Sequence, residues 1–177
     1  MDLKHRKLQR LKDYDYGQNG AYFITICTQD RLSLFASIEN GKLELNHAGK
    51  MVFDKFIEIP KYYPTIDIDN FVVMPNHLHG IVMIQNERTT QGSFPTITLS
   101  DCIQRFKTLT TKLYIDEVKK GNYPRFDKKI WQKSFHDHII RNEHEYQEIN
   151  EYIETNPLKW KEDKYFCKEQ HRGCSLR

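Results

Sequence analysis

Residues 66–84 read IDIDNFVVMPNHLHGIVMI, and this stretch holds two apolar segments separated by Pro75-Asn76. Proline followed by asparagine favours a tight turn and interrupts a continuous strand. The pattern therefore predicts two neighbouring strands, over residues 66–74 and 77–84. Each segment is apolar on both faces, which is typical of a strand in the centre of a sheet. We expect this pair to form the middle of the fold.

Other segments also have the composition of strands. Residues 21–28 (AYFITICT) are dense in β-branched and aromatic side chains, and residues 130–140 (IWQKSFHDHII) alternate between apolar and polar. Asn40-Gly41, a pair favoured in two-residue hairpins, separates residues 34–38 from residues 42–45. The sequence thus predicts adjacent strands that are joined by hairpins and pair antiparallel.

Apolar residues at helical spacing predict three helices. The first covers residues 47–59 and is stopped by prolines, the second begins at Thr98 and ends by Gly121, and the third covers residues 143–155 before Asn156-Pro157. Strands and helices alternate irregularly, and no glycine-rich phosphate loop is present in the sequence. These observations favour an α+β fold, an antiparallel sheet with helices packed on it, over a Rossmann fold.

Length and composition indicate one soluble domain. The chain has 177 residues, of which 38% are hydrophobic and 29% charged, and its net charge is +3. We expect a basic N-terminal arm over residues 1–20, a folded domain over 21–160 and a polar tail over 161–177. No apolar stretch approaches the roughly 18 residues that cross a bilayer, and the N-terminus lacks the pattern of a secretory signal. We therefore expect a cytoplasmic protein that does not bind membranes.

Two histidine pairs stand out as candidate metal ligands. His77 and His79 open a predicted strand, and His136 and His138 lie on another. Residues two apart on a strand project from the same face, so either pair has the spacing to bind one metal ion. Spacing alone does not choose between the pairs, and histidines hydrogen-bonded at the end of a sheet are an equally simple interpretation.

Residues 72–82 (VVMPNHLHGIV) resemble the metal-binding motif of the HUH transposases that act on single strands with one tyrosine, the IS200-like superfamily, and more particularly the REP-associated tyrosine transposases. The resemblance covers nearly the whole chain up to about residue 160. Further matching segments are residues 14–31, 41–49, 106–111, 131–132, 135–142, 152–153 and 156–157. Several motifs in the expected order are more specific than one pair of histidines.

The resemblance implies a ferredoxin-like sheet, a homodimer, and a transposase that cleaves and joins single-stranded DNA near hairpins or palindromic ends. It favours His77 and His79 over the second pair as ligands of a divalent metal ion, magnesium or manganese. It also implies a 5′-phosphotyrosine intermediate and a released 3′ hydroxyl. A phenol has a pKa of about 10, so the metal would be needed to polarise the phosphate that it attacks.

The nucleophile of the family is a tyrosine on the long helix after the histidine strand, and the helix predicted here contains Tyr114. At about 100° per residue, Thr110, Tyr114 and Glu117 lie within about 60° of one another. The family's third metal ligand is an amide one turn after the tyrosine, but Val118 stands there, so we expect Glu117 to replace it. Alternatively, Tyr114 is a packing residue with Glu117 at the solvent, or the helix is aligned one turn differently, with Thr110 in the tyrosine's place.

Basic side chains predict where DNA binds. The candidates are Arg10, Arg105, Lys107, Lys112 and Arg141. Each would neutralise a phosphate, although a charged face on a soluble protein is usually only solvated. Two other functions stay open: a descendant of the family that binds DNA hairpins without catalysis, and a metal-dependent phosphohydrolase that acts on nucleotides.

Overall fold

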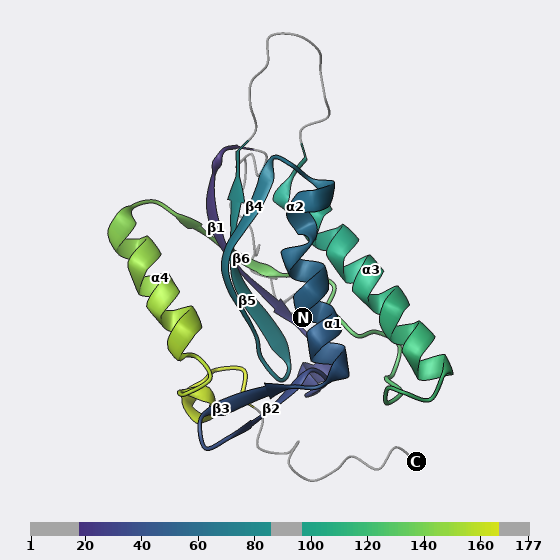
Figure 1. Ribbon diagram of the computed structural model, residues 1–177. Coiled ribbons are helices and arrows are strands. Elements are labelled where there is room, and N and C mark those ends of the chain that lie inside the picture. The colour runs from purple at the N-terminus through teal and green to yellow at the C-terminus, as the bar shows by residue number, and fades with distance from the viewer. Residues whose placement is uncertain (1–17, 86–96, 167–177) are drawn as a thin grey trace, which may run out of the picture.

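The computed structural model describes residues 18–85 and 97–166 (Figure 1). A four-stranded antiparallel sheet has the order β4-β5-β1-β6, and β2 and β3 form a separate hairpin. The strands are β1 (Gly20–Cys27), β2 (Ala36–Glu39), β3 (Lys42–Leu45), β4 (Ile66–Val73), β5 (His77–Ile84) and β6 (His136–Ile140). The helices are α1 (His47–Ile57), α2 (Ile59–Tyr62), α3 (Leu99–Lys119) and α4 (Glu143–Thr155), with short 3-10 turns η1 (Gln29–Arg31) and η2 (Trp160–Glu162). The predicted α+β class is confirmed.

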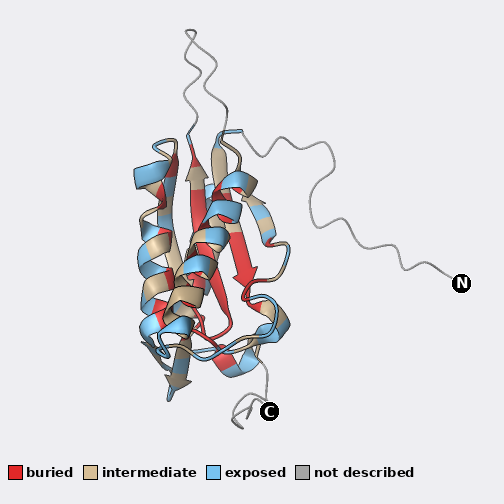
Figure 2. Cartoon of the chain, turned by 90° about the vertical axis from the view of Figure 1, so that its right-hand side faces the viewer, coloured by how far each residue is buried: buried red, intermediate tan, exposed pale blue. Residues whose placement is uncertain are grey.

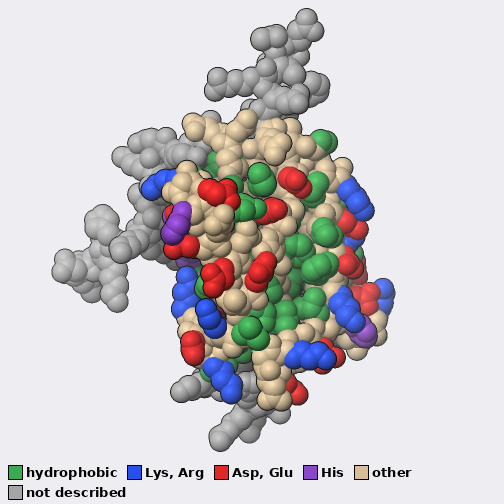
Figure 3. Space-filling model, turned by 60° about the vertical axis from the view of Figure 1, so that its left-hand side comes forward, with side chains coloured by type: hydrophobic (Ala, Val, Ile, Leu, Met, Phe, Trp, Pro, Cys, Tyr) green, Lys and Arg blue, Asp and Glu red, His purple; other side chains and the backbone are tan. Residues whose placement is uncertain are grey.

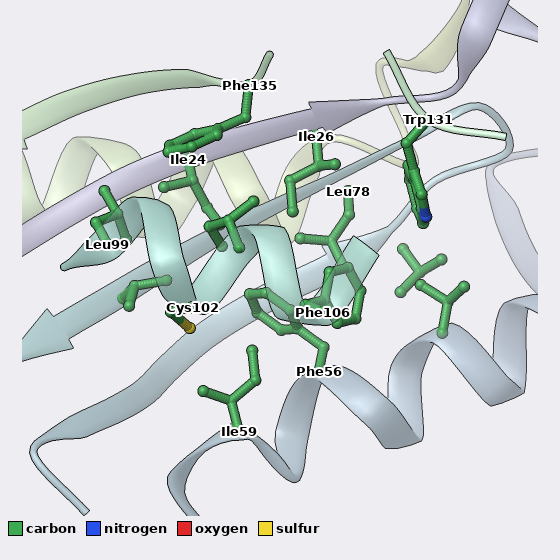
Figure 4. Close-up of a cluster of buried hydrophobic side chains, with 14 of the residues drawn as sticks. Ile24, Ile26, Phe56, Ile59, Leu78, Leu99, Cys102, Phe106, Trp131 and Phe135 are labelled. Atoms are coloured by element: carbon green, nitrogen blue, oxygen red, sulfur yellow. The ribbon is translucent and has the colours of Figure 1, made fainter. Parts of the chain in front are cut away.

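Helices cover both faces of the sheet. In Figure 1, α1, α2 and α3 lie on one side of the sheet and α4 lies on the other. Tyr22, Ile24 and Ile26 alternate along β1 and pack into the main core, which Figure 4 shows between the sheet, α1 and α3. Figure 2 shows that the buried residues follow the strands and the inner sides of these helices. Within the described residues, no helix has both the length and the apolar composition of a membrane span.

Local signals explain where the helices begin. Thr98 and Asp101 form a reciprocal capping box at the start of α3, and the Asn142 side chain accepts a hydrogen bond from the Glu145 backbone at the start of α4. The predicted helix over 47–59 divides into α1 and α2 at Glu58. Pro60 does not end the helical structure, because it lies in the first turn of α2. A backbone N–H in that turn has no hydrogen-bond partner within the helix, so its absence does not destabilise the helix.

Two strand predictions are wrong in part. β4 is an edge strand of the described sheet, not a central one, and its Asp67 and Asp69 side chains are exposed. The strand predicted over 130–140 is present only as His136–Ile140, preceded by a single bridge between Trp131 and Thr28. In the segment before β6, the Lys107 ammonium donates hydrogen bonds to the carbonyls of Gln132 (3.1 Å) and Ser134 (2.8 Å).

Polar side chains take part in the attachment of α4 to the sheet. The Tyr146 hydroxyl donates to the Asp69 carboxylate on β4, and the Asn70 amide donates to Asn150 at 2.9 Å. Ile153 is the buried residue of this helix. This attachment differs from that of α3, which contributes six buried side chains to the structure.

Gly49, in α1, permits a close approach between the helix and the chain before β2. A Cβ atom at this position would lie 2.1 Å from the backbone oxygen of Phe35. Since backbone atoms cannot move aside cheaply, any side chain here forces α1 away from its neighbours.

We predict that Gly49→Ala destabilises the protein by about 1–3 kcal/mol, although alanine is a better helix former by about 1 kcal/mol. Urea denaturation measures the free energy of unfolding. Lys50→Ala, at the exposed neighbouring position of α1, is the control and should change it little. A more stable Gly49→Ala protein would contradict the packing argument.

Candidate active site around His77 and His79

His77 and His79 lie at the start of β5, on the face of the sheet that α4 covers. Both side chains are fully buried, and their ring centroids lie 4.4 Å apart. Leu78, between them, points into the main core on the other face (Figure 4). The alternation of side chains along a strand therefore brings both imidazoles to one place, as the sequence predicted.

Asn76 fixes the proton on His77. Its amide nitrogen donates to the carbonyls of Tyr165 (2.9 Å) and Arg31 (3.3 Å), which turns its Oδ1 toward Nδ1 of His77 at 2.8 Å. Because Oδ1 can only accept, Nδ1 carries the proton. Nε2 of His77 is buried and has no hydrogen-bond partner, so its lone pair is available for a metal ion.

His79 is held from two sides. Thr25 Oγ1 lies 2.8 Å from Nδ1 of His79, and the Tyr152 hydroxyl of α4 lies 3.3 Å from Nε2. The Phe23 ring stacks on the imidazole with centroids 5.3 Å apart. These contacts bring the phenol of Tyr152 directly to the histidine pair.

Asp163 completes a set of three side chains that could hold a metal ion. One donor atom from each of His77, His79 and Asp163 lies within 4.8 Å of the other two. The Asp163 Oδ2 atom also accepts from the Asn156 amide (3.0 Å) and the Tyr152 hydroxyl (3.3 Å). Two imidazoles and one carboxylate form a donor set that suits a divalent ion such as manganese, and the unpartnered Nε2 of His77 fits that role.

The electrostatics of the site favour neutral imidazoles. Burial lowers the pKa of His77 to about 3, and the charges of Lys164 and Arg31 act in the same direction. Burial also lowers the pKa of His79 well below its usual range. Burial, followed by the charge of Asp163, raises the pKa of Tyr152 to about 12. The histidines are thus ready to bind a metal, whereas the phenol needs activation.

The structure does not bring Tyr114 and Glu117 to the histidines. Tyr114 is fully buried on the α3 side of the sheet, where its ring packs against Tyr123 (5.0 Å) and Phe126 (5.6 Å). Burial raises the pKa of Tyr114 to about 12. Glu117 binds Lys120 at 2.6 Å and the Asn122 amide at 2.7 Å. The expected position of Tyr114 and Glu117 beside the histidines is therefore corrected: the sheet separates both from His77 and His79, and the packing interpretation fits.

Sequence reasoning assigned no role to Asp163. It kept Tyr152 only as the next tyrosine to test after Tyr114, and it placed Asn156 only in a segment that matches the family. The spacing between Tyr152 and Asn156 is the signal that could have found them, since it places an amide one turn after a tyrosine, the arrangement sought around Tyr114. Asp163 falls in the predicted tail, but residues 160–166 are folded, and the Tyr165 ring lies 4.7 Å from that of His77. The folded domain thus extends beyond residue 160.

The second histidine pair and the predicted DNA contacts lie elsewhere. His136 and His138 are exposed on the edge strand β6, and Nε2 of His138 is 2.6 Å from Glu145. Arg105 stacks over Tyr62 and Tyr63, Lys107 binds the carbonyls described above, Lys112 is exposed on α3, and Arg141 is exposed after β6. Arg10 lies outside the described residues. A DNA-binding role for these five stays a prediction.

The chain is similar to known transposases in its sequence and in its fold. Residues 19–156 match the family model of IS200-like transposases. An uncharacterised protein of Haemophilus influenzae is 36% identical over 177 residues, covering 93% of this chain and 94% of its own. A solved structure of a REP-associated tyrosine transposase bound to a REP hairpin has a TM-score of 0.57 and 24% identity, covering 85% of this chain and 74% of its own. The last comparison shows a shared fold.

Without metal, the protein should lose stability as the pH falls from 7 to 5. The folded pKa of His77 and His79 lies below the unfolded value of about 6.5, so in this range only the unfolded chain binds these protons. Each histidine should then lower the free energy of unfolding by about 2 kcal/mol between pH 7 and pH 5. Urea denaturation with a chelator measures the change.

His77→Gln should show a smaller loss over the same interval, and the exposed His136→Gln should behave like the wild type. Stability that is independent of pH between 7 and 5 would contradict neutral buried histidines.

Proposed function

The chain belongs to the IS200-like transposase family, and from this premise we propose that it cleaves and rejoins single-stranded DNA with Tyr152 as the nucleophile. The observation that carries the proposal is the position of the Tyr152 hydroxyl, 3.3 Å from both Nε2 of His79 and Oδ2 of Asp163. Tyr152 is 37% exposed, so a DNA strand can reach it. Tyr114 offers neither the exposure nor the neighbours.

His77, His79 and Asp163 would hold a divalent ion, magnesium or manganese. When bound, such an ion supplies Lewis-acid polarisation of a phosphodiester. Asn76 keeps Nε2 of His77 unprotonated for this purpose, and Thr25 holds His79 in place. The amide of Asn156 orients the Asp163 carboxylate between the phenol and the two imidazoles.

Cleavage would proceed by attack of the Tyr152 oxygen on phosphorus, with the 3′ oxygen of the preceding nucleotide as the leaving group. The Asp163 Oδ2 atom is the hydrogen-bond acceptor that the phenol already faces, so it would receive the phenolic proton. The new bond joins Tyr152 to the 5′ phosphate, and the leaving 3′ oxygen takes a proton from water. The resulting 3′ hydroxyl can reverse the step. Reversal onto another strand would complete the transfer.

DNA with a hairpin or palindromic end is the proposed substrate. The related REP-associated transposase is bound to a REP hairpin, which supports this class of DNA. Binding of hairpins without catalysis, and hydrolysis of nucleotides, are the competing functions that the first experiment separates. The homodimer and the cytoplasmic location stay predictions.

With manganese and a library of single-stranded hairpin DNA labelled at the 3′ end, the wild type should form an adduct that survives denaturing electrophoresis. Tyr152→Phe removes the attacking oxygen and should abolish the adduct. Tyr114→Phe, which removes a buried hydroxyl without a partner, should keep it. The same DNA labelled at the 5′ end should give a shorter product that a polymerase can extend from its 3′ hydroxyl.

An adduct that persists in Tyr152→Phe and disappears in Tyr114→Phe would overturn the assignment. Hairpin binding with no adduct in any protein would support the binding-only alternative. Release of phosphate from nucleotides, again without an adduct, would support the phosphohydrolase.

Manganese should stabilise the protein, because it binds the folded state. At 100 times the dissociation constant the gain is about 2.7 kcal/mol, which corresponds to roughly 5–10 °C in melting temperature. His77→Ala and Asp163→Asn should each lose most of the shift, whereas His136→Ala on β6 should retain it. Differential scanning calorimetry with and without manganese measures this, and a full shift in Asp163→Asn would remove Asp163 from the ligand set.

A further inference from the structure

The turn after β1 has an unusual backbone beside the histidine site. Asp30 and Arg31 both have a positive φ, 53° and 57°, although neither is glycine. Two consecutive residues in the left-handed region cost free energy, and such strain gathers where a side chain must be aimed. The backbone of this turn therefore determines where the Arg31 side chain begins.

Hydrogen bonds tie this turn to the histidine strand. The Thr28 backbone N–H donates to the carbonyl of Asn76 at 2.9 Å, and the Asn76 side chain donates to the carbonyl of Arg31 at 3.3 Å. Since the same Asn76 side chain orients His77, the backbone of Arg31 is fixed relative to the metal site. Asn76 thus fixes the backbone of Arg31 and the His77 ring relative to each other.

Two cations lie near the ring of Tyr165, the residue that packs on His77. The Arg31 guanidinium carbon lies 5.6 Å from the centroid of the Tyr165 ring, and the Lys164 ammonium lies 4.9 Å from it. Nη1 of Arg31 donates to the Lys164 carbonyl at 3.0 Å, which leaves further N–H groups for a ligand. Within the part of the chain that the structure describes, neither cation forms an ion pair.

Charge on the neighbouring helix limits where DNA can lie. α4 carries five glutamates and no lysine or arginine, so its outer surface repels a phosphate backbone. In Figure 3, which views this side of the molecule, more of the blue side chains lie in the lower half, among red ones, and β5 begins at the lower end in Figure 1. A strand that reaches Tyr152 would thus pass the end that carries Arg31 and Lys164.

We infer that Arg31 and Lys164 form a clamp for one phosphate of single-stranded DNA, next to the phosphate that Tyr152 attacks. This inference rests on the proposed function. A guanidinium supplies paired N–H donors that match phosphate oxygens, and an ammonium adds a point charge. The clamp fixes the register of the strand, which selects the phosphodiester that faces the nucleophile.

The test measures DNA binding in a Tyr152→Phe background, where the strand stays intact. Fluorescence anisotropy over a series of salt concentrations gives the slope of log affinity against log salt. The double variant Arg31→Gln/Lys164→Gln should lower the magnitude of this slope by about 0.7, and each single variant should lower it by part of that amount, with a loss of affinity of about 3- to 10-fold for the double variant at 0.1 M salt. Lys50→Gln, which removes one exposed charge from α1, should change neither quantity.

Neutral methylphosphonate linkages, placed singly along the strand, then locate the contact. One position should weaken binding in the parent protein, weaken it less in Arg31→Gln, and have no further effect in Arg31→Gln/Lys164→Gln. Arg31→Lys should restore part of the salt slope, and the manganese-induced rise in melting temperature should be unchanged in Arg31→Gln. The clamp proposal would be wrong if the salt slopes of both single variants equalled that of the parent protein. It would also be wrong if a methylphosphonate weakened binding equally at every linkage.

DNA binding is measured in Tyr152→Phe, so the result does not depend on whether the wild type cleaves DNA. If the wild type forms no adduct while the methylphosphonate result holds, the nuclease proposal fails and the clamp stands. If the adduct forms and the slopes do not change, the clamp fails alone.

Discussion

The alternation of side chains along β5 is the constraint on which the site depends. Leu78 must face the core that α1 and α3 build, and the two imidazoles on either side of it must then face α4. A functional group that acts with these histidines has to come from elements on the α4 side. This requirement excludes any residue on α3 that points into the main core, whatever its chemistry.

Asn76 holds together segments around the histidines whose positions do not follow from the alternation of side chains along β5. Its amide bonds three segments that are distant in the sequence: the turn after β1, the start of β5 and the segment after η2. Because the side chain is buried, each of its hydrogen bonds is costly to leave unmade. One amide thus sets the tautomer of a histidine and the position of the residues that surround it.

The sequence was sufficient for most of the fold, because the signals there are local. The Asn40-Gly41 turn has both residues at positive φ, as its type requires, and α4 has the bounds that its pattern predicts. The pairing order of the strands is not local, and β4 was therefore misplaced. For the site, spacing alone does not choose between the two histidine pairs, and the family resemblance was needed to favour His77 and His79. Tyr114 followed from the same resemblance as the tyrosine of the long helix, but helical periodicity does not say which side of the sheet that helix covers. Asp163 reaches the histidines only through the path of the chain after η2, which no periodicity encodes.

The polar attachment of α4 has a consequence for how the protein fails on heating. Water can replace the Tyr146–Asp69 and Asn70–Asn150 hydrogen bonds at little cost, whereas the buried side chains of α3 have no such substitute. Local opening therefore begins at α4, with a smaller free energy than global unfolding requires. Thermal inactivation should precede the melting of the sheet, so that a warmed protein keeps its core and its histidine pair after the tyrosine has moved away.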